Sequence, residues 1–306
     1  MKVFYSNHAP LPLPRQNRFP ASKYSLLRQR VMESGLIPTR DLRIPSPATD
    51  EQLLLVHTPA YLARAMQGKL SPKEMRRIGF PWSEDLVQRV RYSVGGTIEA
   101  CRSALNNGMA INLSGGTHHA HPDFGSGFCM FNDVAVAARC MQAEGLVENV
   151  LILDCDVHQG DGTAAIFADD PSVFTFSIHG AKNFPSRKQQ SDLDLPLQEG
   201  CGDEDYLQIL EDGLNQVVGR VKAELVLYLA GADPFREDVF GGMALTKTGL
   251  AQRDRLVLGR CRDSEIPVAT VLSGGYARKV EDTVNIHFQT LRICLEHAKR
   301  GTQAGK

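Results

Sequence analysis

The feature that most constrains the fold is a series of short apolar runs separated by longer stretches of helical character. The inner runs are nearly continuous in Val, Ile, Leu and Phe, which is typical of parallel strands buried on both faces. The predicted strands cover residues 3–5, 110–113, 150–153, 173–178, 224–230 and 267–272. Helices are predicted to start at or just after Thr58, Ser83, Asn132, Asp203, Thr246 and Lys279. This alternation predicts right-handed crossovers and one parallel sheet with helices on both faces.

The composition is that of a folded chain with no obvious internal division. The 306 residues contain no internal repeat and no linker rich in Pro, Gly or Ser, which favours a single domain over residues 1–306. Residues 1–20 are predicted to be irregular apart from the first strand, and residues 299–306 to form a flexible tail. Apolar residues make up 42% of the chain and charged residues 23%, which excludes an intrinsically disordered protein.

The charge and the cysteine content of the chain limit its possible binding partners and its cellular compartment. The 34 basic and 35 acidic side chains leave a net charge of -1, which gives no general attraction to nucleic acid or to an anionic membrane. No apolar run approaches the ~20 residues that cross a bilayer, and the N-terminus has no apolar leader. The seven cysteines form no CxxC pair, which argues against a disulfide framework and favours the reducing cytoplasm.

Polar side chains and glycines follow the predicted strands where each strand ends. His118 and His119 come after the second predicted strand. Asp233 comes after the fifth strand and Tyr276 after the sixth. Ligands bind outside the carboxyl ends of the strands in open parallel sheets, so we expect these groups to meet in one site.

The run Asp154-x-Asp156-x-His158, at the end of the third predicted strand, carries the strongest chemical signal. Alternate side chains of an extended chain share a face, so Asp156 and His158 can converge on one metal ion. Asp233 can supply the third ligand. Such a set, with one position left open, is a plausible site for a catalytic zinc ion. An isolated Asp at a strand end is usually a cap or turn residue, so the prediction depends on the coincidence of several strand ends.

The adjacent His118 and His119 are predicted to be an acid–base pair beside the metal. One can take a proton from an activated water while its partner tunes or relays that proton. Each ring needs an acceptor to fix its tautomer, and Asp154 and Asp161 flank the metal ligands and are free for that task. His119 is predicted to be the general base, and which histidine protonates the leaving amine stays open.

Two further segments are predicted to contact the substrate. Tyr276 follows Gly274 and Gly275, and its hydroxyl can donate a hydrogen bond to a developing oxyanion. Gly127 lets the backbone approach a ligand closely, and Phe128 offers an apolar wall. A core aromatic is an equally good reading of Phe128 taken alone.

Together these motifs resemble the histone deacetylase family of zinc-dependent acyl-lysine amidohydrolases, with the closest detail in its class IV branch and bacterial relatives. The resemblance covers residues 56–295 and rests on Gly115-Gly116-Thr117-His118-His119-Ala120, Gly127-Phe128-Cys129, Asp154-Cys155-Asp156-Val157-His158, Gly231-Ala232-Asp233 and Ser273-Gly274-Gly275-Tyr276. Residues 15–23 and the loop 180–190 depart from the familiar pattern of the family. Phe184 in that loop is a candidate second aromatic of the tunnel.

The resemblance implies the arginase/deacetylase fold, a three-layer α/β/α sandwich on a mostly parallel sheet. It implies a tunnel for the acyl-lysine chain at Gly127 and Phe128. It also implies roles for a larger set: zinc ligands Asp156, His158 and Asp233, a pair His118–His119 backed by Asp154 and Asp161, and the oxyanion donor Tyr276. A structural potassium or sodium ion is implied, with ligands from the side chains of Asp154 and Ser177 and the main-chain carbonyls of Asp156, His158 and Ile178.

The predicted function is therefore zinc-dependent hydrolysis of an acyl-lysine amide, with acetyl and long-chain acyl groups both open. The alternatives are deacetylation of polyamines or other small amides, a binuclear ureohydrolase, and a catalytically silent acyl-lysine binding protein. Pro234 and Phe235 after Asp233 supply no second carboxylate, which argues against two metal ions. Both histidines and Tyr276 are present, which argues against a silent binder. The sequence does not predict an oligomeric state.

Overall fold

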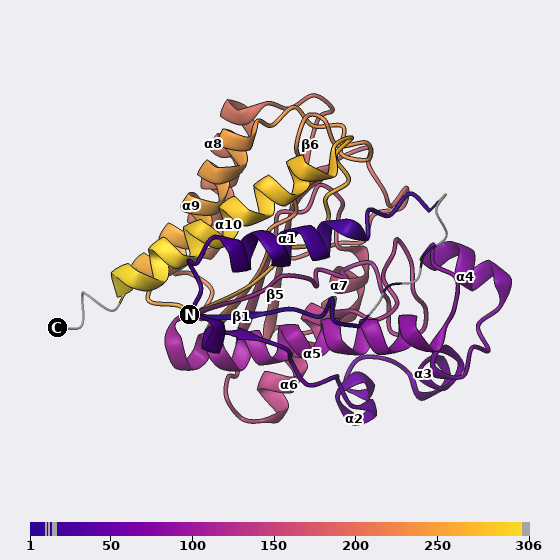
Figure 1. Cartoon of the computed structure of the whole chain (residues 1–306). Coiled ribbons are helices and arrows are strands. Elements are labelled where there is room, and N and C mark those ends of the chain that lie inside the picture. The colour runs from indigo at the N-terminus through magenta and orange to yellow at the C-terminus, as the bar shows by residue number, and fades with distance from the viewer. Residues whose placement is uncertain (10, 12, 14–16, 302–306) are drawn as a thin grey trace.

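The computed structural model describes residues 1–9, 11, 13 and 17–301, and an eight-stranded sheet lies at its centre (Figure 1). All neighbouring strands are parallel, in the order β2-β1-β3-β8-β7-β4-β5-β6. The strands are β1 (Lys2–Phe4), β2 (Leu42–Arg43), β3 (Met109–Asn112), β4 (Val150–Asp154), β5 (Val173–Gly180), β6 (Leu193–Leu197), β7 (Leu225–Leu229) and β8 (Val268–Val271). The predicted parallel sheet is confirmed.

Helices cover both faces of the sheet, so the molecule has three layers (Figure 1). One layer holds α1 (Ser22–Glu33), α8 (Asp203–Val217), α9 (Lys247–Asp263) and α10 (Val280–Gly301). The other holds α2 (Asp50–Leu54), α3 (Pro59–Met66), α4 (Pro72–Ile78), α5 (Glu84–Asn107), α6 (Asp133–Ala143) and α7 (Asp161–Phe167). The three-layer α/β/α fold is therefore confirmed.

The predicted helix starts reflect local capping chemistry. The side chains of the N-cap residues Thr58, Ser83, Asn132 and Thr246 accept hydrogen bonds from backbone N–H groups one turn into α3, α5, α6 and α9. Each bond satisfies a donor that has no partner inside its helix. These caps fix where the helices begin, and hence the length of the loops between strand and helix.

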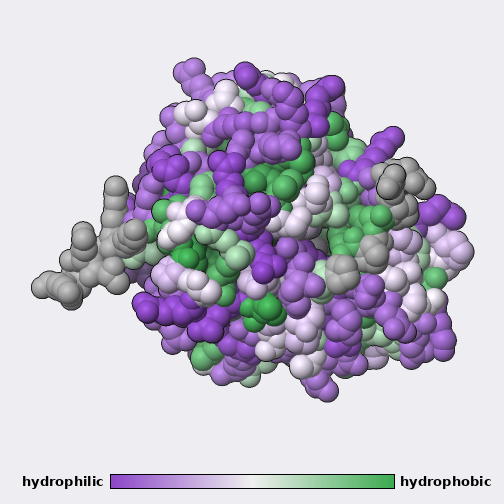
Figure 2. All heavy atoms as spheres, in the orientation of Figure 1, coloured by the Kyte–Doolittle hydropathy of each residue, from purple (hydrophilic) through white to green (hydrophobic). Residues whose placement is uncertain are grey.

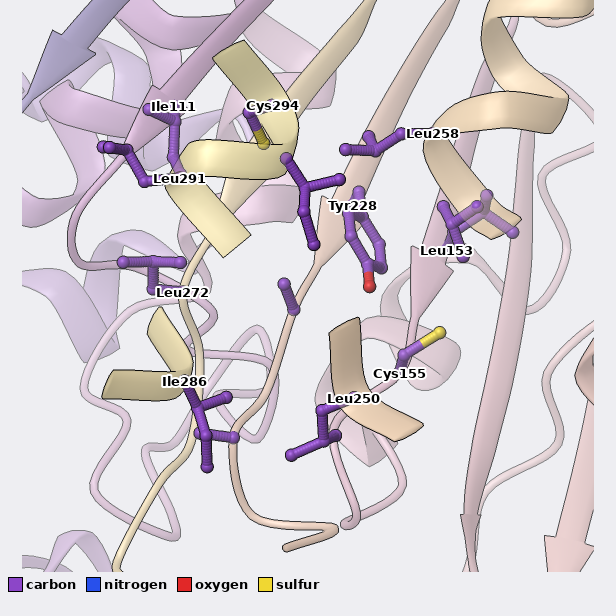
Figure 3. Packing of buried hydrophobic residues seen from close by; sticks show 14 of the residues in the cluster. Ile111, Leu153, Cys155, Tyr228, Leu250, Leu258, Leu272, Ile286, Leu291 and Cys294 are labelled. Carbon is purple, nitrogen blue, oxygen red and sulfur yellow. The ribbon is translucent and has the colours of Figure 1, made fainter. Parts of the chain in front are cut away.

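The core lies on both faces of the sheet because successive strand residues point to opposite sides. In β4, Leu153 packs towards α9 and α10, whereas Ile152 packs towards α5 and α6. Figure 3 shows Leu153 and Tyr228 of the sheet near Leu258 of α9. Both faces of the central strands are thus apolar, which accounts for their nearly continuous apolar sequence.

Two expectations differ from the structure at the margins of the sheet and at the end of the chain. Neither edge strand was predicted: β2 is only two residues long, and Leu193–Leu197 of β6 contains Pro196 and is largely accessible. Helix α10 continues to Gly301, so residues 299–301 of the expected tail are helical. Residues 302–306 lie outside the described part of the chain.

The surface visible in Figure 2 is largely hydrophilic, and the cysteines are unpaired. Hydrophilic side chains cover much of the face in Figure 2, with apolar groups exposed between them. Among the described residues, no helix combines the length and the apolarity that a bilayer span requires. All seven cysteines are free, in accord with the absence of a predicted disulfide framework.

Candidate active site

Four strand ends meet at one edge of the sheet and build a single pocket. β3, β8, β7 and β4 are consecutive in the sheet, so the loops that follow them are neighbours. These loops and the segment before α6 bring the following predicted residues to the pocket wall: His118, His119, Gly127, Phe128, Asp156, His158, Gly274 and Tyr276. The predicted Asp154, Asp161, Asp233 and Gly275 contact these residues from behind.

Asp156, His158 and Asp233 form a compact set of metal-ligand groups. One ligand atom from each lies within 4.8 Å of the others, and all three side chains are buried. Nδ1 of His158 is 3.0 Å from Oδ1 of Asp156 and 3.3 Å from Oδ2 of Asp233. A single ring nitrogen thus faces two carboxylates, and it can donate a proton to only one of them at a time.

The donors of this cluster fit a divalent cation. Asp233 Oδ2 is buried and has no hydrogen-bond partner, which is costly for a carboxylate oxygen. A cation placed among the three groups would bind this oxygen and the His158 nitrogen together. Two carboxylates and one imidazole are among the donor sets of catalytic zinc sites. The described residues contain one such cluster, which favours one metal ion over two.

The loop after β8 holds one ligand in place by a close backbone approach. Oδ2 of Asp156 accepts hydrogen bonds from the Gly274 N–H at 2.8 Å and from the Ser273 hydroxyl at 2.7 Å. A Cβ at Gly274 would lie 1.9 Å from Oδ2 of Asp233. Glycine is therefore required at position 274, because no side chain fits beside the metal cluster, whereas Gly275 packs against Thr283 and Ala232 instead.

The two adjacent histidines each have a carboxylate behind them. Nδ1 of His118 lies 2.6 Å from Oδ2 of Asp154, and Nδ1 of His119 lies 2.6 Å from Oδ1 of Asp161. The two ring centroids are 4.1 Å apart. With Nδ1 engaged, the Nε2 atom of each ring is the one left for exchange with a ligand.

The two histidines differ in their electrostatic surroundings. Burial lowers the pKa of His118, but the charges of Asp154 and Asp156 outweigh it and raise that pKa to about 9. Burial and the neighbouring charge of His118 lower the pKa of His119 to about 4. The pair thus combines one ring that favours the protonated form with one that favours the neutral form.

Tyr276 stands across the pocket from the histidines and is fixed by its backbone. Its N–H donates to Oδ2 of Asp238 at 2.6 Å, and its ring is 6.5 Å from that of His158. The Phe240 ring packs at 5.1 Å on the other side. Burial raises the pKa of the Tyr276 phenol well above its usual value, so the hydroxyl is a donor at neutral pH. Asp238 was not identified from the sequence.

Aromatic rings line the mouth of the pocket. Phe184 packs edge-on against His119, with centroids 4.8 Å apart, and Phe128 lies 5.9 Å from the Tyr276 ring. A Cβ at Gly127 would lie 2.6 Å from Cδ2 of His119, so the backbone there runs close against the ring. Phe128 thus lines the pocket, and Phe184 packs against the His119 ring beside it.

The residues implied for a monovalent ion lie behind the metal cluster. Asp154 and Ser177 are cross-strand partners in β4 and β5. Oδ1 of Asp154 accepts the Asp156 N–H at 3.0 Å, and the Ser177 hydroxyl lies 3.0 Å from Nδ1 of His179. The side chains of Asp154 and Ser177 are buried next to each other, and the ion itself stays a prediction.

Three residues of the N-terminal region line the pocket and were not predicted as site residues. They are Phe19, Lys23 and Tyr24. Lys23 is 2% exposed, and its ammonium donates to the carbonyl oxygens of Ser273 and Gly275. Burial lowers the Lys23 pKa to about 8, against the opposing charge of Asp233. No strand-end pattern marks these residues, because they reach the site through the packing of α1.

Comparison with known proteins places these features in one family. A sequence model of the histone deacetylase domain matches residues 17–291. An uncharacterized protein of Picosynechococcus sp. is 50% identical over 285 residues, which are 93% of this chain and 95% of that protein. Histone deacetylase 2 of Arabidopsis thaliana is 28% identical over 279 residues, 87% of this chain and 72% of that protein.

Solved structures agree with the sequence comparison. The crystal structure of an HDAC homolog complexed with SAHA has a TM-score of 0.84 and 26% identity, and covers 98% of this chain and 84% of its own. An HDAC homolog from Aquifex aeolicus has a TM-score of 0.83 and 26% identity, with coverages of 97% and 84%. With a family match over most of its length, this chain belongs to the histone deacetylase family.

Proposed function

We propose that this protein is a zinc-dependent deacylase that hydrolyses the amide of an acyl-lysine side chain. The observation that carries the proposal is the convergence of three elements in one pocket. These are the metal-ligand cluster, the two histidine–aspartate pairs and the Tyr276 hydroxyl. Each element alone has structural explanations, but metal-assisted amide hydrolysis requires all of them together.

Asp156, His158 and Asp233 would hold the metal ion. When bound, such an ion acts as a Lewis acid that polarises a carbonyl and lowers the pKa of a water towards ~7. The orphaned Oδ2 of Asp233 and the shared Nδ1 of His158 support this assignment. Asp154 and Ser177 would hold a structural monovalent cation behind the cluster.

The histidines would move the protons of the reaction. His119 is the proposed general base: Asp161 fixes its Nδ1, and its Nε2 is free to accept a proton from water. His118, held by Asp154, keeps a positive charge next to the reacting groups. Hydrolysis delivers the water oxygen to the acyl carbon and a proton to the lysine nitrogen, so a free amine leaves.

Tyr276 would stabilise the developing oxyanion. Its phenol stays protonated at neutral pH, so it can donate a hydrogen bond where the carbonyl oxygen gains charge. Phe128, Phe184 and the Gly127 backbone would enclose the methylene chain of the lysine. This narrow, aromatic wall suits an unbranched methylene chain such as that of an acyl-lysine.

The test is hydrolysis of an acetyl-lysine peptide and a myristoyl-lysine peptide by the zinc-loaded protein, with metal content measured in the same samples. Turnover of either peptide by the wild type, with loss in Tyr276→Phe at full metal content, supports the proposal. Turnover of acetylated polyamines alone would favour the small-amide reading. Tight peptide binding without any turnover would show a silent binder and contradict the proposal.

A further inference from the structure

A second, smaller cavity lies beside the catalytic pocket, behind its aromatic wall. Its walls include the rings of Phe19, Tyr24, Phe80, Phe128 and Phe131. Arg89, in the second turn of α5, is the only charged residue among the described residues that line it. An apolar chamber with a single arginine is an unusual composition for a space inside a protein.

Arg89 is buried without a full set of partners. The side chain is 4% exposed, and its Nη1 atom has no hydrogen-bond partner. Its guanidinium carbon lies 4.7 Å from the centre of the Tyr24 ring, which gives the cation an aromatic contact but no counter-charge. Burial lowers the Arg89 pKa, and the only group that raises it is the Tyr24 side chain. Buried charges are normally paired with opposite charges.

Lys23, in the neighbouring catalytic pocket, differs from Arg89 because it has hydrogen-bond acceptors and negative charges around it. Two carbonyl oxygens accept from its ammonium, and the charges of Asp233, Asp238 and Asp156 act on it favourably. Arg89 has no carboxylate among the described residues that plays this role. The part of the chain that the structure describes therefore supplies no carboxylate to pair with Arg89.

The cavity and the catalytic pocket share part of their walls. Phe19, Tyr24, Thr117 and Phe128 line both. The Tyr24 ring lies 5.4 Å from the Lys23 ammonium, which in turn lies 5.2 Å from the Tyr276 ring. The catalytic pocket and the cavity where Arg89 lies therefore adjoin at these four residues.

We propose that this cavity receives the far end of a short acyl chain that terminates in a carboxylate, with Arg89 as its counter-ion. The inference rests on the proposed function, because it names the acyl group that the same site removes. The cavity measures about 50 Å³, which at roughly 10–15 Å³ per water-sized group is room for three to five such groups. The carboxylate end of a glutaryl chain fits that space, and the end of a fatty acyl chain finds no use for the arginine.

The test compares two acyl groups that differ only in charge at the far end. One lysine peptide carries a glutaryl group, and the other carries the same chain ending in a carboxamide. Cleavage of the first adds water across the amide and releases glutarate and the free lysine peptide. We expect the zinc-loaded wild type to prefer the glutaryl peptide in kcat/KM.

Arg89→Met should reduce the ratio of the two kcat/KM values by about tenfold to a hundredfold, as expected for a charged hydrogen bond. Arg89→Lys should restore part of the ratio, because it keeps the charge. Arg102→Met, which removes an arginine from the surface of the same helix, should leave the ratio unchanged. Thermal melting of each variant checks that it folds.

The outcomes separate this inference from the proposed function. If the wild type hydrolyses acetyl-lysine but does not prefer the glutaryl peptide, the inference is wrong and the proposed function stands. If Arg89→Met changes inhibition by glutarate but not the ratio, the cavity binds a released acid, which also overturns the inference. If no peptide is hydrolysed, the proposed function fails. Calorimetric titration with the two uncleaved peptides then decides, because tighter binding of the glutaryl peptide in the wild type but not in Arg89→Met supports the carboxylate site, and equal binding of the two peptides by the wild type refutes it.

Discussion

The two walls of the catalytic pocket are built on different principles. The strand-end wall consists of the loops after β3, β4, β7 and β8, and carries the metal-ligand cluster, the histidine pairs and Tyr276. The N-terminal wall consists of Phe19, Lys23 and Tyr24, with Arg89 behind them. On the strand-end wall nearly every buried polar atom has a partner, Asp233 Oδ2 being the exception at the metal cluster. On the N-terminal wall aromatic faces surround two buried cations.

We expect the strand-end wall to carry out the reaction and the N-terminal wall to determine which acyl group is accepted. Dense hydrogen bonding to the sheet holds reacting groups in fixed positions, which is what catalysis requires. Aromatic packing around buried cations shapes a space without acting on the reacting atoms. We therefore expect changes on the strand-end wall to alter metal binding and turnover, and changes on the N-terminal wall to alter which acyl group is accepted.

The largest expected effect comes from removing a metal ligand. Asp233→Ala should lower the affinity for zinc by more than about 100-fold, since loss of even an outer partner of a ligand costs 10- to 100-fold. Metal analysis of purified protein checks this. Phe19→Ala, on the opposite wall of the same pocket, should keep a full metal complement. A full complement in Asp233→Ala would contradict the ligand assignment.

Tyr276→Phe tests the strand-end wall without touching the metal. Loss of one oxyanion donor should reduce kcat by about 10²–10³. The measurement is steady-state hydrolysis of an acetyl-lysine peptide, with zinc content determined in parallel. Turnover close to that of the wild type would show that the hydroxyl has no part in the reaction.

Asp238 is expected to act through Tyr276, since it accepts the Tyr276 N–H at 2.6 Å. Asp238→Ala should lower kcat by about tenfold, in line with one charged hydrogen bond. The double variant with Tyr276→Phe should be no slower than Tyr276→Phe alone, because both act on one hydroxyl. Glu237→Ala is the matched control from the neighbouring position. Fully additive losses would mean that Asp238 has a separate role.

A last prediction concerns stability in acid rather than activity, and it tests the support beneath the strand-end wall. His57 accepts the Asn132 N–H at 3.0 Å and lies 3.1 Å from the His121 carbonyl oxygen. Burial lowers its pKa from 6.5 to about 4. As pH falls below 6.5 the unfolded chain binds a proton before the folded chain does, so stability is lost between pH 6.5 and about 4.

Urea unfolding at neutral pH and at pH 5 measures this loss. At pH 5 the protonation of His57 in the unfolded chain lowers the free energy of unfolding by about 2 kcal/mol. This value follows from the roughly 1.5 pH units between the unfolded pKa of His57 and pH 5. His57→Gln should therefore show a loss on acidification that is smaller by about this amount. Equal losses in wild type and variant would mean that His57 does not titrate differently in the folded chain.

Local sequence patterns predicted most of the strand-end wall, although not Asp238, and none of the N-terminal wall. Asp156 and His158 could be paired because alternate residues of an extended segment share a face. Asp233 and Tyr276 could be added because parallel strands end at one edge. In both cases a short-range pattern determines a position in space.

The N-terminal wall has no such pattern. Arg89 lies in an amphipathic helix, where an arginine reads as a solvent-exposed residue, and its burial depends on packing against α1 and the N-terminal segment. Lys23 reaches the pocket because α1 packs beside α10, more than 250 residues later in the chain. Contacts between residues so far apart in the sequence depend on the whole fold, so no local sequence pattern predicts them.

The central claim is that the strand-end wall hydrolyses an amide with one metal ion. The most direct test is to add zinc stepwise to metal-free protein and to follow release of acetate from an acetyl-lysine peptide. We predict no turnover without metal, a rise in proportion to added zinc, and saturation at one ion per chain. Saturation at two ions per chain, or full turnover without metal, would contradict the claim.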